Sequence, residues 1–542
     1  MPTLAFAADA PSAAATKRVD AGLDPVTSGS SNFTTFSSPA KKSVQSRVAA
    51  APAAAAPAAG AAAAPAAQSA NPTLAVALNG QYTSAYGLSL DTIVTSDAVA
   101  LTTVISWGDG TTSTVNSFGA GTSTTAHTYA QLGPYQISVT VSDASGNKAA
   151  NTASVTTAGS DYTAFGPTRL LDTRDGTGAA KAPVQPYTGT RLKVGGSNGI
   201  PSGVTAVAIN VTVTNAAAGG HITVYGEGDT KPTTSNVNFS AGQTVPNMVI
   251  VPVGSNGYID LYNDGWGTVD LIGDVAGYFT RSASSGYTSL ASTRLVDTRN
   301  GTGTTQGQVA PGTSFPVQIA GAAGGQLPAG VTAVALNVTV TNPRSAGYLT
   351  VYPSGQNAPS ASNVNFSEGQ TIANSVIAPV GSDGKIRVKN GAWTAADVIV
   401  DVVGYYSTAS HSAYLPVVPE RVIDSRTAAD GPSIPGGYYY PVVMFPDAAD
   451  VTGYVFNATV TNTAGTGFLA TTPDPNTLDT YKNGTPVWPT RAPGSTLNWL
   501  RGQTVPNLVQ ATGGSTGIVD FWNISDGDAD LVVDWFGFYQ ND

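Results

Sequence analysis

Polar and apolar residues alternate along most of this chain beyond residue 71. Between residues 207 and 213 every odd position is Val or Ile, whereas Asn210 and Thr212 stand between them. The same alternation returns at 334–341. A period of two is that of a β-strand, whose successive side chains point to opposite faces. The pattern therefore predicts strands with one apolar face and one Asn/Thr face, and we expect the second face to meet solvent or a ligand.

Shorter strands follow at a regular spacing. In the segment after residue 214 we expect strands at 222–225, 237–239, 245–252 and 258–262, a turn at 254–257, and a last strand that approaches Tyr278. Strands at intervals of about 8 to 12 residues, joined by Gly-rich turns, are typical of two-sheet sandwiches and closed barrels. The predicted fold class is all-β, with antiparallel sandwich or barrel modules.

One long segment occurs three times. Its first landmark is a charged motif that reads Arg169-Leu-Leu-Asp-Thr-Arg174, Arg294-Leu-Val-Asp-Thr-Arg299 and Arg421-Val-Ile-Asp-Ser-Arg426. Each motif is followed by an Asn-x-Thr-Val-Thr-Asn segment, a Gly-Gln-Thr segment that ends in Asn, and a closing Asp with aromatic residues. These landmarks define modules at 161–281, 286–407 and 413–542. A repeated module usually repeats a contact, so three weak contacts would bind a repetitive ligand by avidity.

A smaller segment at 72–158 also has the alternation of strands. It contains Trp107-Gly-Asp109-Gly, then His127-Thr-Tyr129, then Gly-Pro-Tyr. With these pieces the segment resembles a polycystic-kidney-disease (PKD) domain. The resemblance implies a small β-sandwich in which the Trp packs between two sheets and Gly-Asp-Gly forms a turn, so the four numbered residues are expected to be structural. It also implies an extracellular role in spacing or weak association.

The three long modules resemble a repeat of secreted and cell-wall-associated actinomycete proteins. That repeat occurs alone or appended to hydrolases, and the resemblance implies no function for named residues. The third module departs from the pattern: Asp526 stands where the first two modules have Trp266 and Trp393, Trp499 replaces a Phe, and residues 481–494 are interpreted as an insertion. A contact shared by the modules is therefore least secure in the third.

The first 71 residues differ in composition from the rest. Ala5-Phe-Ala7 has the small-x-small form of a signal-peptidase site, although the basic and long apolar regions that precede such a site are missing. We interpret residues 1–7 as the remnant of a signal peptide; the alternative is a chance match in an Ala-rich tail. Residues 8–71 are rich in Ala and Pro, so we expect a disordered, extended spacer.

Composition argues against several classes of partner. The formal net charge is −10, from 24 Lys and Arg against 34 Asp and Glu, and there is no basic stripe, so we expect no nucleic-acid partner. No segment is apolar enough to span a bilayer, which argues against membrane insertion. The chain has no Cys, so disulfides and thiolate metal sites are excluded.

Catalytic and metal-binding patterns are weak. Two Gly-x-Ser-x-Gly segments, around Ser197 and Ser515, lack the following helix that a nucleophile elbow needs. The three histidines are far from metal-ligand spacing and do not recur between modules. An acidic run at 526–530 occurs in the third module alone, and we interpret it as a solvated loop rather than a calcium site. We therefore expect no enzyme activity, no cofactor and no metal.

The charged motif admits two interpretations. Its Asp and second Arg are two residues apart and share a strand face, so they could bind an acidic or sugar ligand. We favour structural ion pairs that tie the first strand of each module to its last, through Asp274, Asp401 or Asp534, because the motif lies beside an apolar run. The residues concerned are Arg169, Asp172, Arg174, Arg294, Asp297, Arg299, Arg421, Asp424 and Arg426.

Two Trp residues are the best candidates for ligand binding. Trp266 and Trp393 stand at the same position of the first two modules, three residues after Asn263 and Asn390, in Gly-containing loops. An exposed ring with amide groups at its edge has the chemistry of a sugar-stacking platform. The alternative is that each ring folds back over the end of its module as a packing plug.

Together these features predict a secreted protein, extracellular or cell-wall associated, without catalytic activity. Its modules would bind cell-surface or extracellular polysaccharide through repeated weak contacts. One alternative is a structural or attachment subunit of a secreted assembly, which binds a protein partner rather than glycan. Another, ranked far behind, is a glycoside hydrolase or lyase with paired carboxylates.

Overall fold

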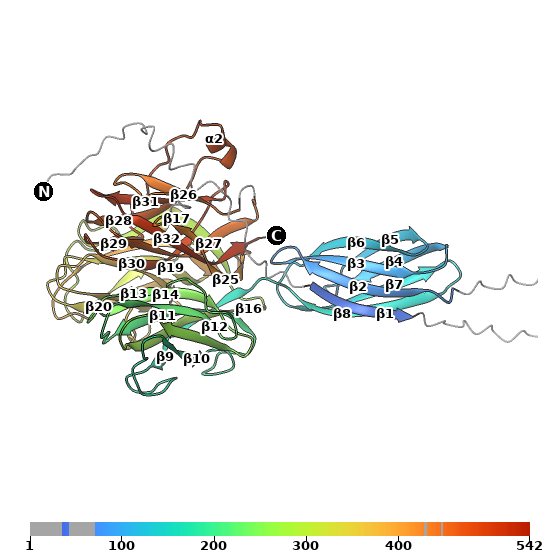
Figure 1. Ribbon diagram of the computed structural model, residues 1–542, viewed down its shortest axis with the longest axis horizontal. Coiled ribbons are helices and arrows are strands. Elements are labelled where there is room, and N and C mark those ends of the chain that lie inside the picture. Colours follow the sequence, from blue (N-terminus) through green and yellow to red (C-terminus); the bar gives the residue numbers. More distant parts are fainter. Residues whose placement is uncertain (1–34, 43–70, 428–430, 446–447, 542) are drawn as a thin grey trace, which may run out of the picture. The chain divides into compact units, whose positions relative to one another are not determined.

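The chain forms two compact units, which we describe separately. The computed structural model describes residues 35–42, 71–427, 431–445 and 448–541 (Figure 1). The smaller unit holds the described residues up to 159, and the larger unit holds those from 160 to 541. The expected signal-peptide remnant at 1–7 lies outside the described residues, and so do 8–34 and 43–70 of the expected spacer.

The smaller unit is a sandwich of two four-stranded antiparallel sheets, with strand orders β1-β2-β3-β6 and β5-β4-β7-β8. Alternate side chains point into the space between the sheets, as the period of two predicts: Ile137, Val139 and Val141 of β7 are fully buried. The strands are β1 (Thr35–Lys42), β2 (Ala75–Tyr82), β3 (Gly87–Thr95), β4 (Ala100–Ser106), β5 (Thr112–Phe118), β6 (Gly121–Thr128), β7 (Pro134–Asp143) and β8 (Lys148–Thr156).

The residues that carry the PKD resemblance pack inside this sandwich. Trp107 and Tyr129 are buried, and the Trp107 ring stacks on His127 with 4.5 Å between ring centroids. His127 Nε2 lies 2.8 Å from Asp109 Oδ2, while the backbone N–H and hydroxyl of Thr111 donate to Asp109 Oδ1. Burial alone would raise the pKa of Asp109, but these hydrogen bonds outweigh it and lower the pKa to about 2. These hydrogen bonds hold the Gly-Asp-Gly turn around Asp109 against the His127 side chain.

The prediction of a spacer over 8–71 is wrong for residues 35–42. These residues form β1, which pairs with the free edge of β2. The Phe36 ring lies over Gly80, where a Cβ atom would come within 2.2 Å of the ring, so the missing side chain makes the contact possible. Pro39 lies at the irregularity in the β1–β2 register, a position that an edge strand tolerates. The Ala/Pro-rich composition of the surrounding segment concealed this short strand.

The larger unit contains three modules, each a sandwich of two four-stranded antiparallel sheets. In the first module the inner sheet has the order β14-β11-β16-β9 and the outer sheet β10-β15-β12-β13, and the other two modules repeat both orders.

The strands of module 1 are β9 (Asp161–Asp172), β10 (Thr188–Lys193), β11 (Val204–Thr214), β12 (Gly220–Gly226), β13 (Val237–Phe239), β14 (Val245–Pro252), β15 (Tyr258–Asn263) and β16 (Asp270–Thr280). Those of module 2 are β17 (Gly286–Asp297), β18 (Ser314–Gln318), β19 (Val331–Thr341), β20 (Gly347–Pro353), β21 (Val364–Phe366), β22 (Ile372–Pro379), β23 (Lys385–Asn390) and β24 (Asp397–Ser407). Those of module 3 are β25 (Ala413–Asp424), β26 (Tyr439–Val443), β27 (Val451–Thr461), β28 (Gly467–Pro473), β29 (Leu497–Trp499), β30 (Val505–Ala511), β31 (Ile518–Ser525) and β32 (Asp530–Gln540). The described helices are the 3-10 turn η2 (Ala323–Gly325) and α2 (Leu478–Lys482).

The three inner sheets pack against one another and close into a ring. Strands β14, β22 and β30 contact each other around the common axis. Backbone bridges join module 1 to 2, 2 to 3, and 3 back to 1: they are Tyr162–Ser285, Tyr287–Ser412 and Tyr414–Ser160. The repeats predicted tandem modules, but their closure into one ring is visible only in the structure.

The Asn/Thr face of each central inner strand faces the next module rather than solvent or ligand, which corrects the expectation from the alternation. Asn210 of module 1 donates to Ser362 O at 2.8 Å and accepts from Asn374 Nδ2 at 3.0 Å, both in module 2. All the asparagines concerned are buried. The equivalent Asn–Asn pairs are Asn337–Asn507, between modules 2 and 3, and Asn457–Asn247, between modules 3 and 1.

Aromatic residues from the start of each module's first strand and from the end of its last strand form a shared core at one end of the axis, which we call the proximal end. Because each ring pair joins two modules, this core ties the whole ring together. The pairs are Tyr162–Tyr406 at 4.2 Å, Tyr287–Tyr539 at 4.1 Å and Phe279–Tyr414 at 4.7 Å between centroids.

We expect the change Asn374→Ala to destabilise the ring by about 2 kcal/mol or more, because it leaves buried groups of two modules without partners. The Asn374 amide donates to Asn210 Oδ1 and Asn363 O, and its Oδ1 accepts the Met248 N–H. Calorimetry of the full chain should show a lower melting temperature for the whole larger unit. The matched change Asn357→Ala, at an exposed position of the same module, should leave the melting temperature unaltered. An unchanged transition in Asn374→Ala would contradict the ring.

Candidate functional site

The opposite, distal end of the ring collects the segments singled out from the sequence. In module 1, β9 and β11 end at the distal end, and β14 and β16 begin there. The register shows this: Asp172, the last residue of β9, pairs with Ile272 near the start of β16, and Val213 near the end of β11 pairs with Val245, the first residue of β14. The loop between β15 and β16, which carries Trp266, therefore lies at the distal end. Modules 2 and 3 have the same register, so their equivalent loops lie at this end too.

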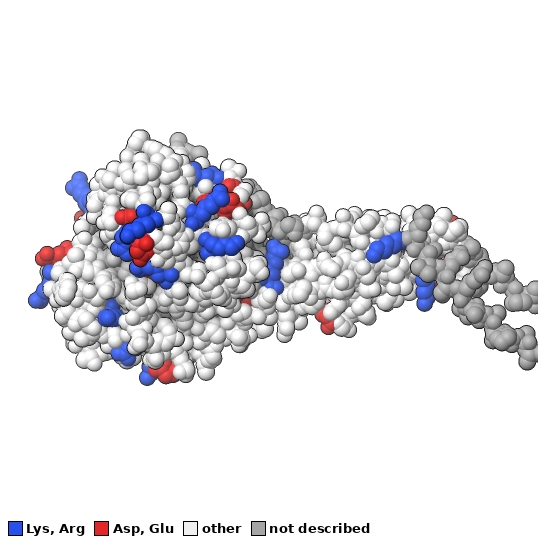
Figure 2. All heavy atoms as spheres, turned by 90° about the horizontal axis from the view of Figure 1, so that it is seen from below, with Lys and Arg blue, Asp and Glu red and all other residues white. Residues whose placement is uncertain are grey.

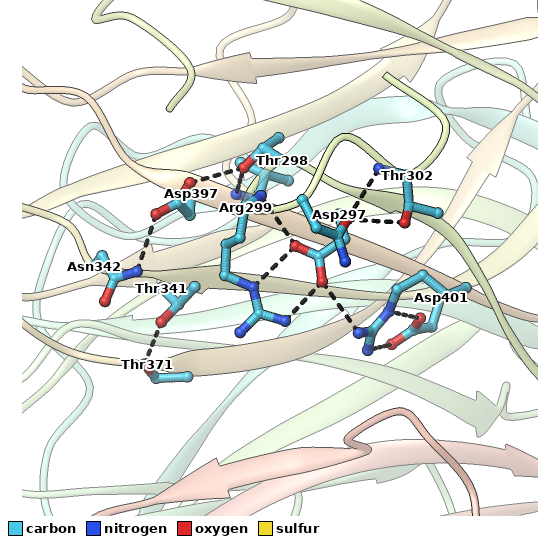
Figure 3. Close-up of polar contacts among 12 residues, drawn as sticks. Asp297, Thr298, Arg299, Thr302, Thr341, Asn342, Thr371, Asp397 and Asp401 are labelled. Carbon is cyan, nitrogen blue, oxygen red and sulfur yellow. Dashed lines mark hydrogen bonds and ion pairs between the residues drawn. The ribbon is translucent and has the colours of Figure 1, made fainter. Parts of the chain in front are cut away.

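The charged motif forms a closed ion-pair network, as Figure 3 shows for module 2. Arg294 is bidentate to Asp401 on the last strand, with Nε–Oδ1 at 2.9 Å and Nη2–Oδ2 at 3.1 Å. Its Nη1 also donates to Asp297 Oδ2 at 3.2 Å, and Arg299 binds the same carboxylate through Nε and Nη2 at 2.9 and 2.6 Å. Thr298 Oγ1 donates to Asp397. The motif thus joins the first and last strands, as expected from the sequence.

Modules 1 and 3 repeat this network, through Asp274 and Asp534. The pKa values of Asp172, Asp297 and Asp424 lie below the ordinary value, chiefly because the following Arg of each motif donates to the carboxylate. These three carboxylates are buried and fully engaged with their own arginines. The alternative of a ligand-binding charged motif therefore finds no support in the geometry.

Trp266 and Trp393 are the most exposed large rings of the larger unit's described part. Their relative exposures are 78% and 91%. The alternative interpretation, in which the rings plug the module ends, is therefore wrong. In module 3 the equivalent position is the exposed Asp526, so the distal end carries two such rings rather than three.

Asn263 and Asn390 do not stand at the edge of a ligand site, so their predicted binding role is wrong. Both side chains are 0% exposed. Asn263 Oδ1 accepts the Gly265 N–H, and its Nδ2 donates to the carbonyls of Val184 and Gly267. Asn390 makes equivalent bonds in its own loop. These asparagines shape the loops that hold the Trp rings outward.

Tyr187 is a site residue that the sequence did not indicate. It is 48% exposed and packs edge-to-face on Trp266, with 5.5 Å between centroids. Its N–H bonds to Asn263 O, as the N–H of Gly312 and Gly437 do to the equivalent Asn of modules 2 and 3. Tyr187 has φ of 56°, in the left-handed region where the other two modules use glycine. The one sequence signal for this residue is that Tyr187 stands where the other two modules have glycine.

A cavity of about 640 Å³ lies among the three modules at the distal end. Its walls include Gln243, Gln370 and Gln503, the glutamines of the three Gly-Gln-Thr segments. Asn238, also in the wall, has a buried Oδ1 without a hydrogen-bond partner among the described residues. The cavity therefore offers amide groups and apolar side chains, such as Phe239 and Ile372, but no cluster of charge.

Charged side chains are sparse on the face shown in Figure 2. Within the described part of the chain, no group of three or more His, Cys, Asp or Glu side chains is placed to hold a metal ion. The same residues contain no helix that is long and apolar enough to cross a membrane.

Comparisons with known proteins support the sequence interpretation of the smaller unit. Residues 87–156 match the PKD domain family, which confirms that part of the resemblance. A search of curated proteins finds no match. The chain is therefore a multidomain all-β protein that contains a PKD domain, and the resemblance of its three modules to the actinomycete repeat stays a prediction.

Similar solved structures include a chain of the Sulfolobus turreted icosahedral virus, with 10% identity, covering 72% of this chain and 87% of that one, at a TM-score of 0.16. Another is the SGBP-B protein of the Bacteroides ovatus mixed-linkage glucan utilization locus, in complex with a mixed-linkage heptasaccharide. It has 12% identity, covers 83% of this chain and 92% of that one, and has a TM-score of 0.12.

Proposed function

We propose that this protein is a non-catalytic, secreted binding protein that holds cell-surface or extracellular polysaccharide against the distal end of its ring. The observation that carries the proposal is the pair of Trp rings, 78% and 91% exposed, at equivalent positions of two modules. A large apolar ring held in water at a repeated position is typical of a binding surface. Sugar rings stack on such faces through their C–H groups.

The rigid surroundings of the rings support this function. Asn263 and Asn390 lock the two loops, so little conformational entropy is lost when a ligand binds. Tyr187 keeps a left-handed backbone beside Trp266, a conformation that costs about 1–3 kcal/mol for a residue other than glycine. Backbone strain of this kind is concentrated at functional sites.

An attachment subunit that binds a protein partner is the second candidate. The distal cavity favours it, because all three modules supply its wall and a single protein segment could contact them together. Amide groups such as those of Gln243, Gln370 and Gln503 can bond to the backbone of such a segment as well as to sugar hydroxyls.

A glycan array, with a pull-down on secreted proteins in parallel, tests the proposal. We expect the full chain to bind one class of extended polysaccharide and to leave that polymer uncleaved on prolonged incubation. Binding to a secreted protein with no retained glycan would overturn the proposal in favour of the attachment subunit. Release of shorter sugars from the polymer would show an enzyme instead.

A further inference from the structure

The third module carries a cover that the other two lack. The segment between β28 and β29 is 474–496, whereas its counterparts are 227–236 and 354–363. In module 3 this longer segment, which includes α2, lies over the outer sheet: Tyr481 packs on Val443 and Ile518. We call residues 474–494 the lid.

Beneath the lid lies an aromatic sheet face. Trp488 of the lid packs edge-to-face on Tyr439 at 5.1 Å and on Trp522 at 5.8 Å between centroids. The same face of module 1 is uncovered and carries an ion pair, with Arg191 Nε 3.3 Å from Asp260 Oδ1. The strand register places Asp520 at the position of Asp260, opposite Pro441 where module 1 has Arg191. Asp520 has therefore lost its cationic partner.

Asp520 is fully buried, and neither of its carboxyl oxygens has a hydrogen-bond donor among the described residues. Thr472 of β28 pairs with Asp520, and Asp474, the first residue of the lid, lies two residues further on, so its side chain is a diagonal neighbour of Asp520 on the same face. Asp474 Oδ1 already accepts from Asn476, and Oδ2 accepts from the Tyr481 hydroxyl. Two carboxyl groups can attract each other only when one of them carries a proton, since both are otherwise acceptors.

The surroundings offer no positive charge to replace that proton. The titratable groups that act on Asp520 are Asp474 and Tyr481 from the lid and Tyr439 from β26. The other ionisable side chains of the lid, Asp479, Lys482 and Arg491, are exposed. An uncompensated carboxylate in this buried position would be strongly unfavourable.

We propose that the lid is held closed by a proton shared between Asp474 and Asp520, and that it opens as the pH rises and that proton is lost. Burial raises the pKa of Asp520 well above its ordinary value, with the Asp474 charge adding to the shift. A group with a raised pKa stabilises the closed form fully below its ordinary pKa, and this contribution is lost as the pH rises toward the folded-state pKa. Opening would uncover Tyr439 and Trp522 on the outer face of module 3.

Hydrogen exchange of the lid, measured on the full chain, tests this proposal. The variant Asp520→Asn keeps the shape of the side chain but has no carboxyl proton to lose. It is compared with the native chain at the same pH, so that the intrinsic exchange rates of the two chains cancel. At pH about 4 both lids should be equally protected. Over the range in which the shared proton is lost, opening of the native lid should rise by up to about tenfold per pH unit relative to the variant. Asp528→Asn, a change at an exposed carboxyl group of the same module, should behave as native.

Equal protection of the two lids at every pH would overturn the proposal. Calcium that restores the native lid at high pH, without effect on Asp520→Asn, would also overturn it, since the carboxylates would then hold a cation instead. Infrared spectroscopy of the native chain gives a measurement that does not depend on folding of the variant. A protonated carboxyl band should persist at neutral pH and disappear as the lid opens, and its absence at neutral pH would contradict the shared proton.

Discussion

Replacing Asp297 with Ala is expected to lower the free energy of unfolding of the larger unit by about 3 kcal/mol, the lower end of the range for breaking a buried ion pair. Asp297 is 1% exposed and accepts from both Arg294 and Arg299. The effect falls at the lower end because the Arg294 and Arg299 side chains are 24% and 45% exposed, so water compensates part of the loss.

The transition should shift for the whole ring rather than for module 2 alone. Residues of all three modules share one apolar core, including Ala335, Ile377 and Val455 beside those of module 1. Calorimetry of the full chain should therefore show a single displaced transition for the larger unit. Removing the exposed carboxyl group of Glu368 in the same module should leave it in place. Separate melting of module 2 would show that the modules fold independently.

The effect of Asp297→Ala should also depend on pH. The pKa of Asp297 lies below its ordinary value, chiefly because Arg299 donates to it. A lowered pKa means that the ion pair stabilises the fold above the ordinary pKa of about 4 and that this contribution is lost on acidification. The native and variant chains should therefore converge in stability as the pH falls below about 4.

The double change Trp266→Ala with Trp393→Ala is expected to weaken attachment to an extended polysaccharide by about a hundredfold or more, whereas each single change weakens it by about tenfold. The two rings are fixed on one rigid unit, so a polymer that spans both keeps one contact when the other is lost. Melting temperatures should not move, because the rings are 78% and 91% exposed.

Phe118→Ala is the matched control for these changes, because Phe118 is a 70% exposed aromatic ring of the smaller unit. It should bind the polymer as the native chain does. Undiminished binding by the double Trp variant would show that the two rings are not part of the binding site. The distal cavity would then be the next candidate.

The sequence predicted the strands well where a strand has one distinct apolar face. The expected strands at 237–239 and 245–252 coincide with β13 and β14. The same reasoning failed for the other face of the central strands. Asn210 has the pattern of a solvated position, yet its partner Asn374 is supplied by another module, and a period of two contains no information about such a partner.

The candidate site was predicted in part for a similar reason. Exposure of the two Trp rings follows from their place in Gly-containing loops, but Asn263 bonds to its own loop, a choice that residue type alone does not fix. Tyr187 and the Asp474–Asp520 pair depend on neighbours distant in the sequence. The structural role of the charged motifs was easier to predict from the sequence, because a buried Arg–Asp–Arg group beside an apolar run must compensate its own charge.

Titration of the full chain with a soluble polysaccharide, and with short oligosaccharides cut from the same polymer, tests the proposed function most directly. If the two Trp rings form one rigid surface, the polymer should bind at least about tenfold more tightly than an oligosaccharide too short to reach both, at equal sugar concentration. Equal affinity for the polymer and the short oligosaccharide would contradict binding at both rings. Failure of the chain to bind any polysaccharide in solution would contradict the proposed function itself.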